Sequence, residues 1–211
     1  MKTANIAVLV SGGGTNLQAL IDAQTSGIIK SGKISLVVSS NPDAYALTRA
    51  EKAGIPTVVV AKKACASKED FEEKIINALE NANTDIIVLA GFMCILSENF
   101  TKKYANRIIN VHPSLIPSFC GAGFYGLKVH EAALGYGVKV TGATVHFVNE
   151  IPDGGKIILQ KAVDILEGDT PEVLQKRVME QAEWIILPRA CELVCADIIK
   201  NKSEVKYNGF I

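Results

Sequence analysis

Residues 5–16 read NIAVLVSGGGTN, a short apolar run that ends in a glycine turn and leads into a segment with helical periodicity. Such a run predicts a buried strand, a tight turn and the start of a helix. The same succession of strand and helix recurs through the first hundred residues. Because strands that alternate with helices form parallel sheets, this segment predicts the first unit of a doubly wound α/β fold.

The wider pattern supports a Rossmann-like, mostly parallel sheet with helices on both faces. Ser67 is a good N-cap for one of the helices, because acidic residues follow it in the first turn. The predicted strands cover residues 5–10, 34–39, 57–60, 85–90, 107–110, 141–148 and 156–164, and the predicted helices between them cover 16–25, 44–53 and 68–80.

The rhythm changes after residue 110. A loop rich in Pro and Gly at 112–126 leads to a short helix and then to two long strands joined by NEIPDGG. Thr170 as N-cap and Pro171 at the first helical position open a late helix, which Pro188 is expected to kink or interrupt. No linker separates the halves. We expect one domain over 1–211, with a phosphate-binding half to about residue 100 and a catalytic half after it.

Composition limits the class of partner. The chain of 211 residues has 22 basic and 22 acidic side chains, so it lacks the basic excess that nucleic acids and anionic membranes require. No apolar run reaches the ~18 residues of a membrane span, and the first strand is too short for a signal peptide. We therefore expect a cytoplasmic protein. Five cysteines without a CxxC pair and three histidines without paired spacing indicate no metal site.

The turn SGGGTN at 11–16 is the first candidate site. A dinucleotide fingerprint would need glycine where Leu17 stands, and no Gly-Lys-Ser/Thr of a Walker loop follows. Backbone amides at a helix start still suit a single phosphate. The candidate ligands are Gly13, Gly14, Thr15 and Asn16, and the alternative is a tight turn capped by Thr15.

Asn110 and His112 form the second candidate site, at the end of a predicted strand. Side chains two apart on a strand lie on the same side, so an amide donor and an imidazole would face one point. Together they could stabilise a tetrahedral oxyanion. The alternative is a hydrogen-bonded core histidine.

Asp153 is the third candidate. Asp before Gly-Gly is ordinary hairpin chemistry, so a turn is the default interpretation. A carboxylate beside the histidine would instead raise its pKa and orient the ring. Nothing in the sequence brings Asp153 next to His112.

Four motifs, in this order and spacing, closely resemble the folate-dependent phosphoribosylglycinamide formyltransferase family. They are SGGGTNLQAL at 11–20, VLAGFMCIL at 88–96, INVHPSLIPSF at 109–119 and GATVHFVNEIPDGGKIILQ at 142–160. The resemblance extends from residue 5 to about 190. It implies a formyltransferase-type fold and transfer of the formyl group of 10-formyltetrahydrofolate to the amine of glycinamide ribonucleotide, in purine biosynthesis, without metal or ATP.

The resemblance also implies residue roles. Asn110 and His112 match the family's catalytic pair, and Asp153 matches the carboxylate that raises the histidine pKa. The loop of Gly13, Gly14, Thr15 and Asn16 matches the ribonucleotide phosphate site, and Glu183 resembles a further ribonucleotide contact. The residues that match the folate side are Lys68, Met93, Cys94, Ile95, Leu96, Asn110, Val148, Asn149 and Glu150, with the loop 148–153 around the pterin ring.

Two departures from the family stand out. Many relatives carry Arg at the position of Cys94, so a cation is missing from that pocket. The loop 118–128 is longer than in many members, and neither Tyr125 nor His130 receives a role.

Other functions share this pattern. Formyltetrahydrofolate hydrolase has a similar catalytic half but usually carries an extra N-terminal domain, and methionyl-tRNA formyltransferase normally adds a C-terminal one. Formyltransferases of sugar nucleotides, and a non-catalytic nucleotide-binding module, are further alternatives. The sequence leaves both a monomer and a homodimer open.

Overall fold

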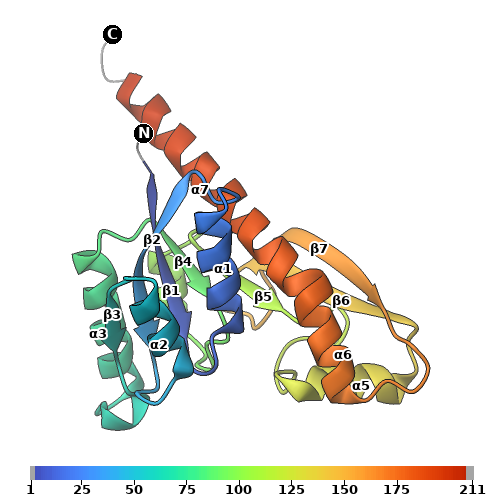
Figure 1. The fold of residues 1–211 in the computed structure, drawn as a ribbon. Helices are drawn as coiled ribbons and strands as arrows, with labels where there is room; N and C mark the ends of the chain where they lie inside the picture. The colour runs from blue at the N-terminus through green and yellow to red at the C-terminus, as the bar shows by residue number, and fades with distance from the viewer. Residues whose placement is uncertain (1–2, 208–211) are drawn as a thin grey trace. The chain divides into compact units, whose positions relative to one another are not determined.

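The computed structural model describes residues 3–207, whose elements are labelled in Figure 1. Within them the chain forms two compact units. Residues up to 94 and from 191 onward make the first unit, and residues 95–190 make the second. The last helix therefore contributes its later turns to the first unit, although the sequence suggested halves that meet near residue 100. The single domain over 1–211 stays a prediction.

The first unit contains four parallel strands in the order β3-β2-β1-β4. They are β1 (Ala4–Val10), β2 (Gly32–Ser39), β3 (Thr57–Val59) and β4 (Ile86–Leu89). All four residues of β4 and six of the seven in β1 are buried, which explains their almost unbroken apolar sequences.

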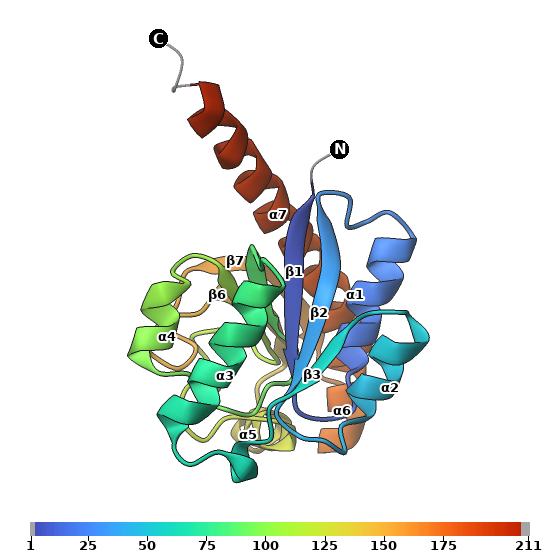
Figure 2. The ribbon, with the colours of Figure 1, turned by 90° about the vertical axis from the view of Figure 1, so that its left-hand side faces the viewer.

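Helices cover both faces of these strands. Helices α1 (Thr15–Thr25) and α2 (Tyr45–Lys52) lie on one side and α3 (Lys68–Asn81) on the other, as Figure 2 shows. The short 3₁₀ helix η1 (Lys62–Ala64) precedes α3. The predicted Ser67 cap is confirmed, because its Oγ accepts a hydrogen bond from the Asp70 N–H at 3.2 Å.

The second unit contains three antiparallel strands, β5 (Ile108–His112), β6 (Val140–Phe147) and β7 (Ile157–Asp164). The register of β5 against β6 decides the site, because it sets Asn110 opposite His146 and His112 opposite Thr144. Opposed residues point to the same face of a sheet, so these four side chains are neighbours. Helices α4 (Glu98–Lys103) and α5 (Leu127–Tyr136) belong to this unit, together with the late helical segment up to Ala190.

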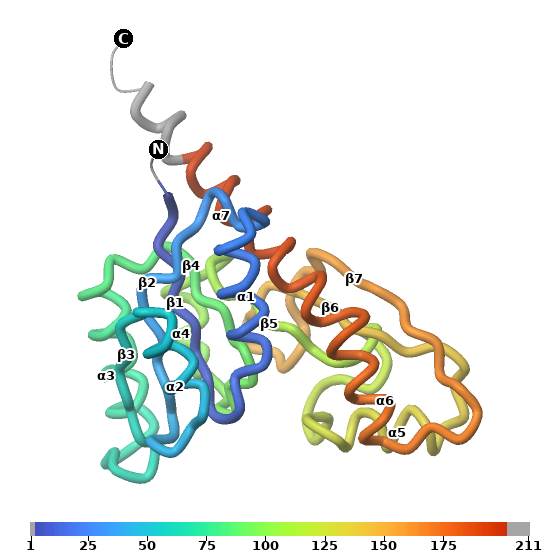
Figure 3. Tube along the Cα trace, viewed as in Figure 1, coloured from blue at the N-terminus to red at the C-terminus, as the bar shows by residue number. Residues whose placement is uncertain are grey.

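A long helical segment closes the chain. Helix α6 (Pro171–Val178) passes through the π-helical turn η2 (Met179–Glu183) into α7 (Trp184–Tyr207), a path that Figure 3 follows. The predicted Thr170 cap is confirmed, since its side chain accepts from the Val173 N–H. The expected interruption at Pro188 is wrong, because α7 continues through it. The irregular part of this helical segment is instead the π-helical turn η2, which ends at Glu183, before Pro188.

The predicted α/β class is confirmed. Every predicted strand and helix is present, with ends shifted by at most two residues, and β5 continues to His112 instead of ending at Asn110. Helix α4 was not predicted, since it has only six residues. Within residues 3–207, no helix is long and apolar enough to cross a membrane.

Candidate active site

The glycine turn lies at the carboxyl end of β1, where it begins α1. Gly14 is the N-cap with φ 72°, and no side chain caps the helix, so the Thr15 cap considered above is not formed. A Cβ on Gly14 would lie 2.6 Å from the Ala46 Cβ, so both conformation and packing require glycine. The hydroxyls of Ser11 and Ser40 are 2.7 Å apart beside this turn. The N-terminus of a helix, with its partial positive charge, suits an anion.

Arg49 brings a cation to this turn, and the sequence analysis missed it. Its Nε donates to the Gly13 carbonyl at 2.9 Å and its Nη1 donates to Gln18 Oε1 at 3.1 Å. The guanidinium also lies 5.0 Å from the centre of the Tyr45 ring. The only available signal was a basic residue 33 positions after Asn16, which no motif links to the turn.

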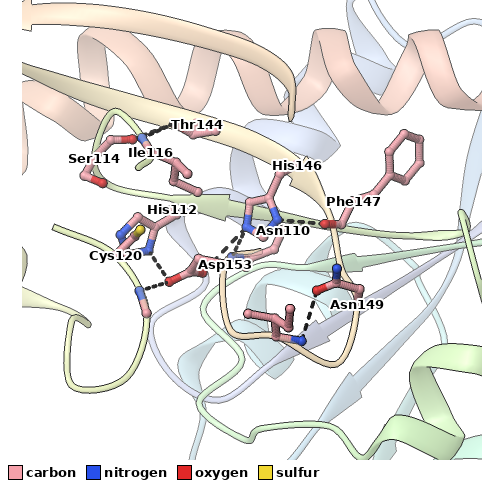
Figure 4. Close-up of polar contacts among 12 residues, drawn as sticks. Asn110, His112, Ser114, Ile116, Cys120, Thr144, His146, Phe147, Asn149 and Asp153 are labelled. Carbon is pink, nitrogen blue, oxygen red and sulfur yellow. Dashed lines mark hydrogen bonds and ion pairs between the residues drawn. The ribbon is translucent and has the colours of Figure 1, made fainter. Parts of the chain in front are cut away.

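The second unit gathers the polar groups of the catalytic hypothesis (Figure 4). Asn110 and His112 lie on one side of β5, as the two-residue spacing predicts, and His112 is buried. Asp153 reaches them from the loop between β6 and β7. Its Oδ2 is 3.5 Å from His112 Nδ1, and its Oδ1 is 3.6 Å from His146 Nε2. The structure therefore brings Asp153 beside His112.

The loop that carries Asp153 owes its shape to local chemistry. Asn149 Oδ1 accepts from the Ile151 N–H at 3.0 Å, and the Gly154 N–H donates to the Ile151 carbonyl at 2.9 Å. Asp153 has φ 57°. A Cβ on Gly155 would meet the Phe147 carbonyl oxygen at 1.7 Å, so only glycine lets the loop close so tightly. The turn and the functional interpretation of Asp153 are thus compatible.

The long loop after β5 holds this pair through its backbone. His112 Nε2 donates to the Phe119 carbonyl at 2.9 Å, and the Gly121 N–H donates to Asp153 Oδ2 at 2.8 Å. Phe119 has φ 49°, and its ring packs edge-on against Phe124 and Tyr136. The sequence analysis gave this loop no role.

Burial decides the charge of His112. Burial lowers the pKa of His112 below its usual 6.5, although the hydrogen bond to Phe119 and the charge of Asp153 each act in the opposite direction. The expectation that Asp153 raises the histidine pKa therefore holds for its own contribution but is wrong for the net shift.

Asp153 stays ionised in the same surroundings. Burial alone would raise its pKa, but contacts with His146, the Gly121 N–H and the His112 ring outweigh burial and leave the pKa below 3.8. A stable carboxylate between two rings can support a cation that forms during a reaction.

Two further buried histidines surround the candidate catalytic residues. His146 is buried, and its Nε2 lies 3.2 Å from Asn110 Nδ2. His130 is fully buried and neither ring nitrogen has a hydrogen-bond partner. Burial, aided by the nearby His112, lowers the pKa of His130 to about 4.

The candidate folate residues lie in both units and are described unit by unit. In the first, Lys68 begins α3 with its Nζ 3.9 Å from Glu72, Met93 is exposed, and Cys94 is partly exposed. In the second, Ile95 is 71% exposed, so its apolar side chain is available to a flat ring, whereas Leu96 is buried. Val148 and Asn149 are half-buried, and Glu150 is exposed. Glu183 is buried in the π-helical turn.

Among residues 3–207, no group of three His, Cys, Asp or Glu side chains is arranged as metal ligands. The absence of a metal from the reaction stays a prediction.

Comparison with known proteins identifies the family. A family model described as formyl transferase matches residues 4–191. The chain belongs to the formyl transferase family. It is similar to the phosphoribosylglycinamide formyltransferase of Haemophilus influenzae, with 41% identity over 96% of this chain and 92% of that protein.

Further members of the formyl transferase family are also similar to this chain. A crystal structure of glycinamide ribonucleotide transformylase 1 from Symbiobacterium toebii has 40% identity and a TM-score of 0.86, over 92% of this chain and 89% of that one. The trifunctional purine biosynthetic protein adenosine-3 of Homo sapiens is 46% identical over 94% of this chain. The chain spans only 19% of the length of that protein. The predicted formyltransferase-type fold is confirmed.

The titration of His112 tests the balance of burial and charge. We expect its ring carbon resonances to titrate with a midpoint below 6.5 in NMR spectra. In Asp153→Asn the midpoint should move further down, because the carboxylate charge that favours the imidazolium is lost. A midpoint that rises in this variant would contradict the description.

His130 should make the protein less stable in acid. The unfolded chain binds a proton at this ring near pH 6.5 and the folded one only near pH 4, so the free energy of unfolding should fall as the pH drops through that range. The loss amounts to about 3 kcal/mol when complete. His130→Phe should flatten this dependence in urea titrations at several pH values, and an unchanged slope would refute it.

Proposed function

We propose that this protein is a phosphoribosylglycinamide formyltransferase. It transfers the formyl group of 10-formyltetrahydrofolate to the amine of 5-phosphoribosylglycinamide, and the products are formylglycinamide ribonucleotide and tetrahydrofolate, in de novo purine biosynthesis. The observation that carries the proposal is the grouping of Asn110, His112 and Asp153 in a chain that aligns with nearly the full length of the Haemophilus influenzae formyltransferase.

The residues suit acyl transfer to an amine. 10-Formyltetrahydrofolate supplies the formyl group when bound. Asn110 offers a neutral amide N–H to the formyl oxygen, where negative charge develops as the new carbon–nitrogen bond forms. That charge favours protonation of the His112 ring, which Asp153 then stabilises as an ion pair. Preorganised donors of this kind act most strongly where water is excluded, and His112 is buried.

Protons must also move from one nitrogen to another. The attacking amine loses a proton as its bond to the formyl carbon forms, and the departing folate nitrogen needs one as its bond breaks. In its unprotonated form, which burial favours, His112 can accept the first proton. Asp153, through His112 or a water molecule, can pass a proton onward. No oxidant, metal or nucleotide triphosphate is needed to balance this exchange.

The glycine turn is the proposed phosphate site of the ribonucleotide. Gly13, Gly14, Thr15 and Asn16 supply the backbone and side-chain donors, and Arg49 supplies positive charge beside the turn. We assign Glu183 to the ribonucleotide only by its resemblance to the family.

We propose the folate-binding residues from apolar side chains that are exposed. In the second unit the exposed side chain of Ile95 suits a flat ring, and the loop Val148, Asn149 and Glu150 supplies backbone groups. In the first unit Met93 is exposed, and we assign it to the folate by the resemblance to the family. Cys94 brings no cation, so this chain is expected to bind the glutamate tail differently from relatives with Arg there. Lys68 is the basic residue proposed for this side. A cytoplasmic location, and a monomer or homodimer, remain predictions.

The test is release of tetrahydrofolate by the purified chain, followed with and without the ribonucleotide. Release that depends on the ribonucleotide supports the transferase. Release without any acceptor would instead favour the hydrolase, and absence of release in both would contradict the proposal.

Two single variants test the catalytic residues. His112→Ala and Asp153→Asn should each lower turnover by at least ~10²–10³-fold, the usual loss for a group that stabilises an oxyanion. Circular dichroism and thermal melting should show a retained fold. Normal turnover by either folded variant would remove that residue from the mechanism.

Arg49 tests the phosphate site. Arg49→Met should raise KM for the ribonucleotide by about 10- to 100-fold, since a hydrogen bond to a charged group contributes about 1.5–3 kcal/mol. KM for the folate should stay unchanged, and Arg49→Lys should recover part of the affinity. Equal effects on both substrates would argue against a phosphate contact.

A further inference from the structure

We propose that His146 is a positioning residue that fixes the orientation of the Asn110 amide. The two residues lie opposite each other in the register of β5 and β6, and His146 is only 1% exposed. This inference rests on the proposed function only for its effect on turnover. The orientation itself follows from hydrogen bonds.

The backbone determines which nitrogen of His146 carries the proton. His146 Nδ1 is 2.8 Å from the Phe147 carbonyl oxygen. A carbonyl oxygen only accepts hydrogen bonds, so Nδ1 must carry the hydrogen. In a neutral ring the other nitrogen, Nε2, then has a lone pair and accepts.

That lone pair selects one of the two orientations of the Asn110 side chain. His146 Nε2 lies 3.2 Å from Asn110 Nδ2, a distance suited to an N–H donated to the ring. With the amide turned round, its oxygen would face the lone pair and both groups would lose a hydrogen bond. The NH₂ group therefore stays directed to this side of the strand, with its second N–H left for an acceptor.

Asp153 makes the arrangement depend on the charge of the ring. Its Oδ1 lies 3.6 Å from the same Nε2, and the other groups facing the ring are Asn110 and the Phe147 carbonyl. A proton on Nε2 would turn this nitrogen into a donor to Asp153, and Asn110 would lose its acceptor. The neutral ring with hydrogen on Nδ1 is thus the form that holds Asn110 ready to donate to the formyl oxygen.

NMR tests the orientation without any reference to activity. In ¹⁵N spectra of the whole protein near pH 7.5, His146 should show a protonated Nδ1 and an unprotonated Nε2. In His146→Leu the Asn110 side-chain amide resonances should shift, because one N–H loses its partner. A protonated Nε2, or an unchanged Asn110 amide in the variant, would overturn the proposal.

Kinetics test the consequence. His146→Leu should lower kcat by up to ~10²-fold, which is the usual effect of losing an oxyanion donor. The KM for each of the two substrates should change little. His146→Gln should keep most of kcat, because its carboxamide oxygen can accept from Asn110. Val145→Ala, on the same strand but facing the other side, is the control for disturbed strand packing and should have kcat near wild type.

The outcomes separate the two proposals. If His146→Gln lowers kcat as much as His146→Leu does, or if His146→Leu leaves kcat unchanged, the positioning role is wrong. If the wild-type protein transfers no formyl group, the proposed function fails, and the NMR result still decides the orientation of Asn110. If His146→Leu does not fold, the NMR signals of wild-type His146 remain the deciding observation.

Discussion

A buried carboxylate that must remain charged is the constraint on which this site depends. Asp153 lies between the His112 and His146 rings and takes a hydrogen bond from the Gly121 N–H. The Gly121 N–H and the positive charge that either ring can take up offset the cost of burial, because a lone charge in a protein interior is costly. The same burial lowers the pKa of His112, and the charge of Asp153 acts against this shift. Each group therefore shifts the pKa of the other.

The surrounding fold can be understood as the means of assembling those partners. The antiparallel register of β5 and β6 sets Asn110 against His146, and the two loops that follow these strands supply the Gly121 N–H and Asp153. Thr144 anchors the start of the long loop, because its hydroxyl donates to the Ser114 carbonyl at 2.7 Å. The Phe119 and Phe147 carbonyls and the Gly121 N–H contact the site through the backbone, which point substitutions do not remove.

The sequence predicted what short-range patterns encode. Apolar runs, caps and turns located the strands and helices, and the two-residue spacing placed Asn110 and His112 on one face. Asp153 and His112 are 41 positions apart in the sequence, so no local pattern encodes the contact between them. Arg49 and His146 were missed for the same reason, and the pKa of His112 was misjudged because burial, which the sequence does not show, outweighs the neighbouring charge.

The charge of Asp153 can be measured directly. The ¹³C resonance of its side-chain carboxyl group, assigned by comparison with Asp153→Asn, should keep the shift of an ionised carboxylate from pH 8 down to pH 4.5. This follows because the pKa lies below its ordinary value of 3.8. A protonation step within that range would show that burial wins over the two histidines and the Gly121 N–H, and it would contradict the account of the site given above.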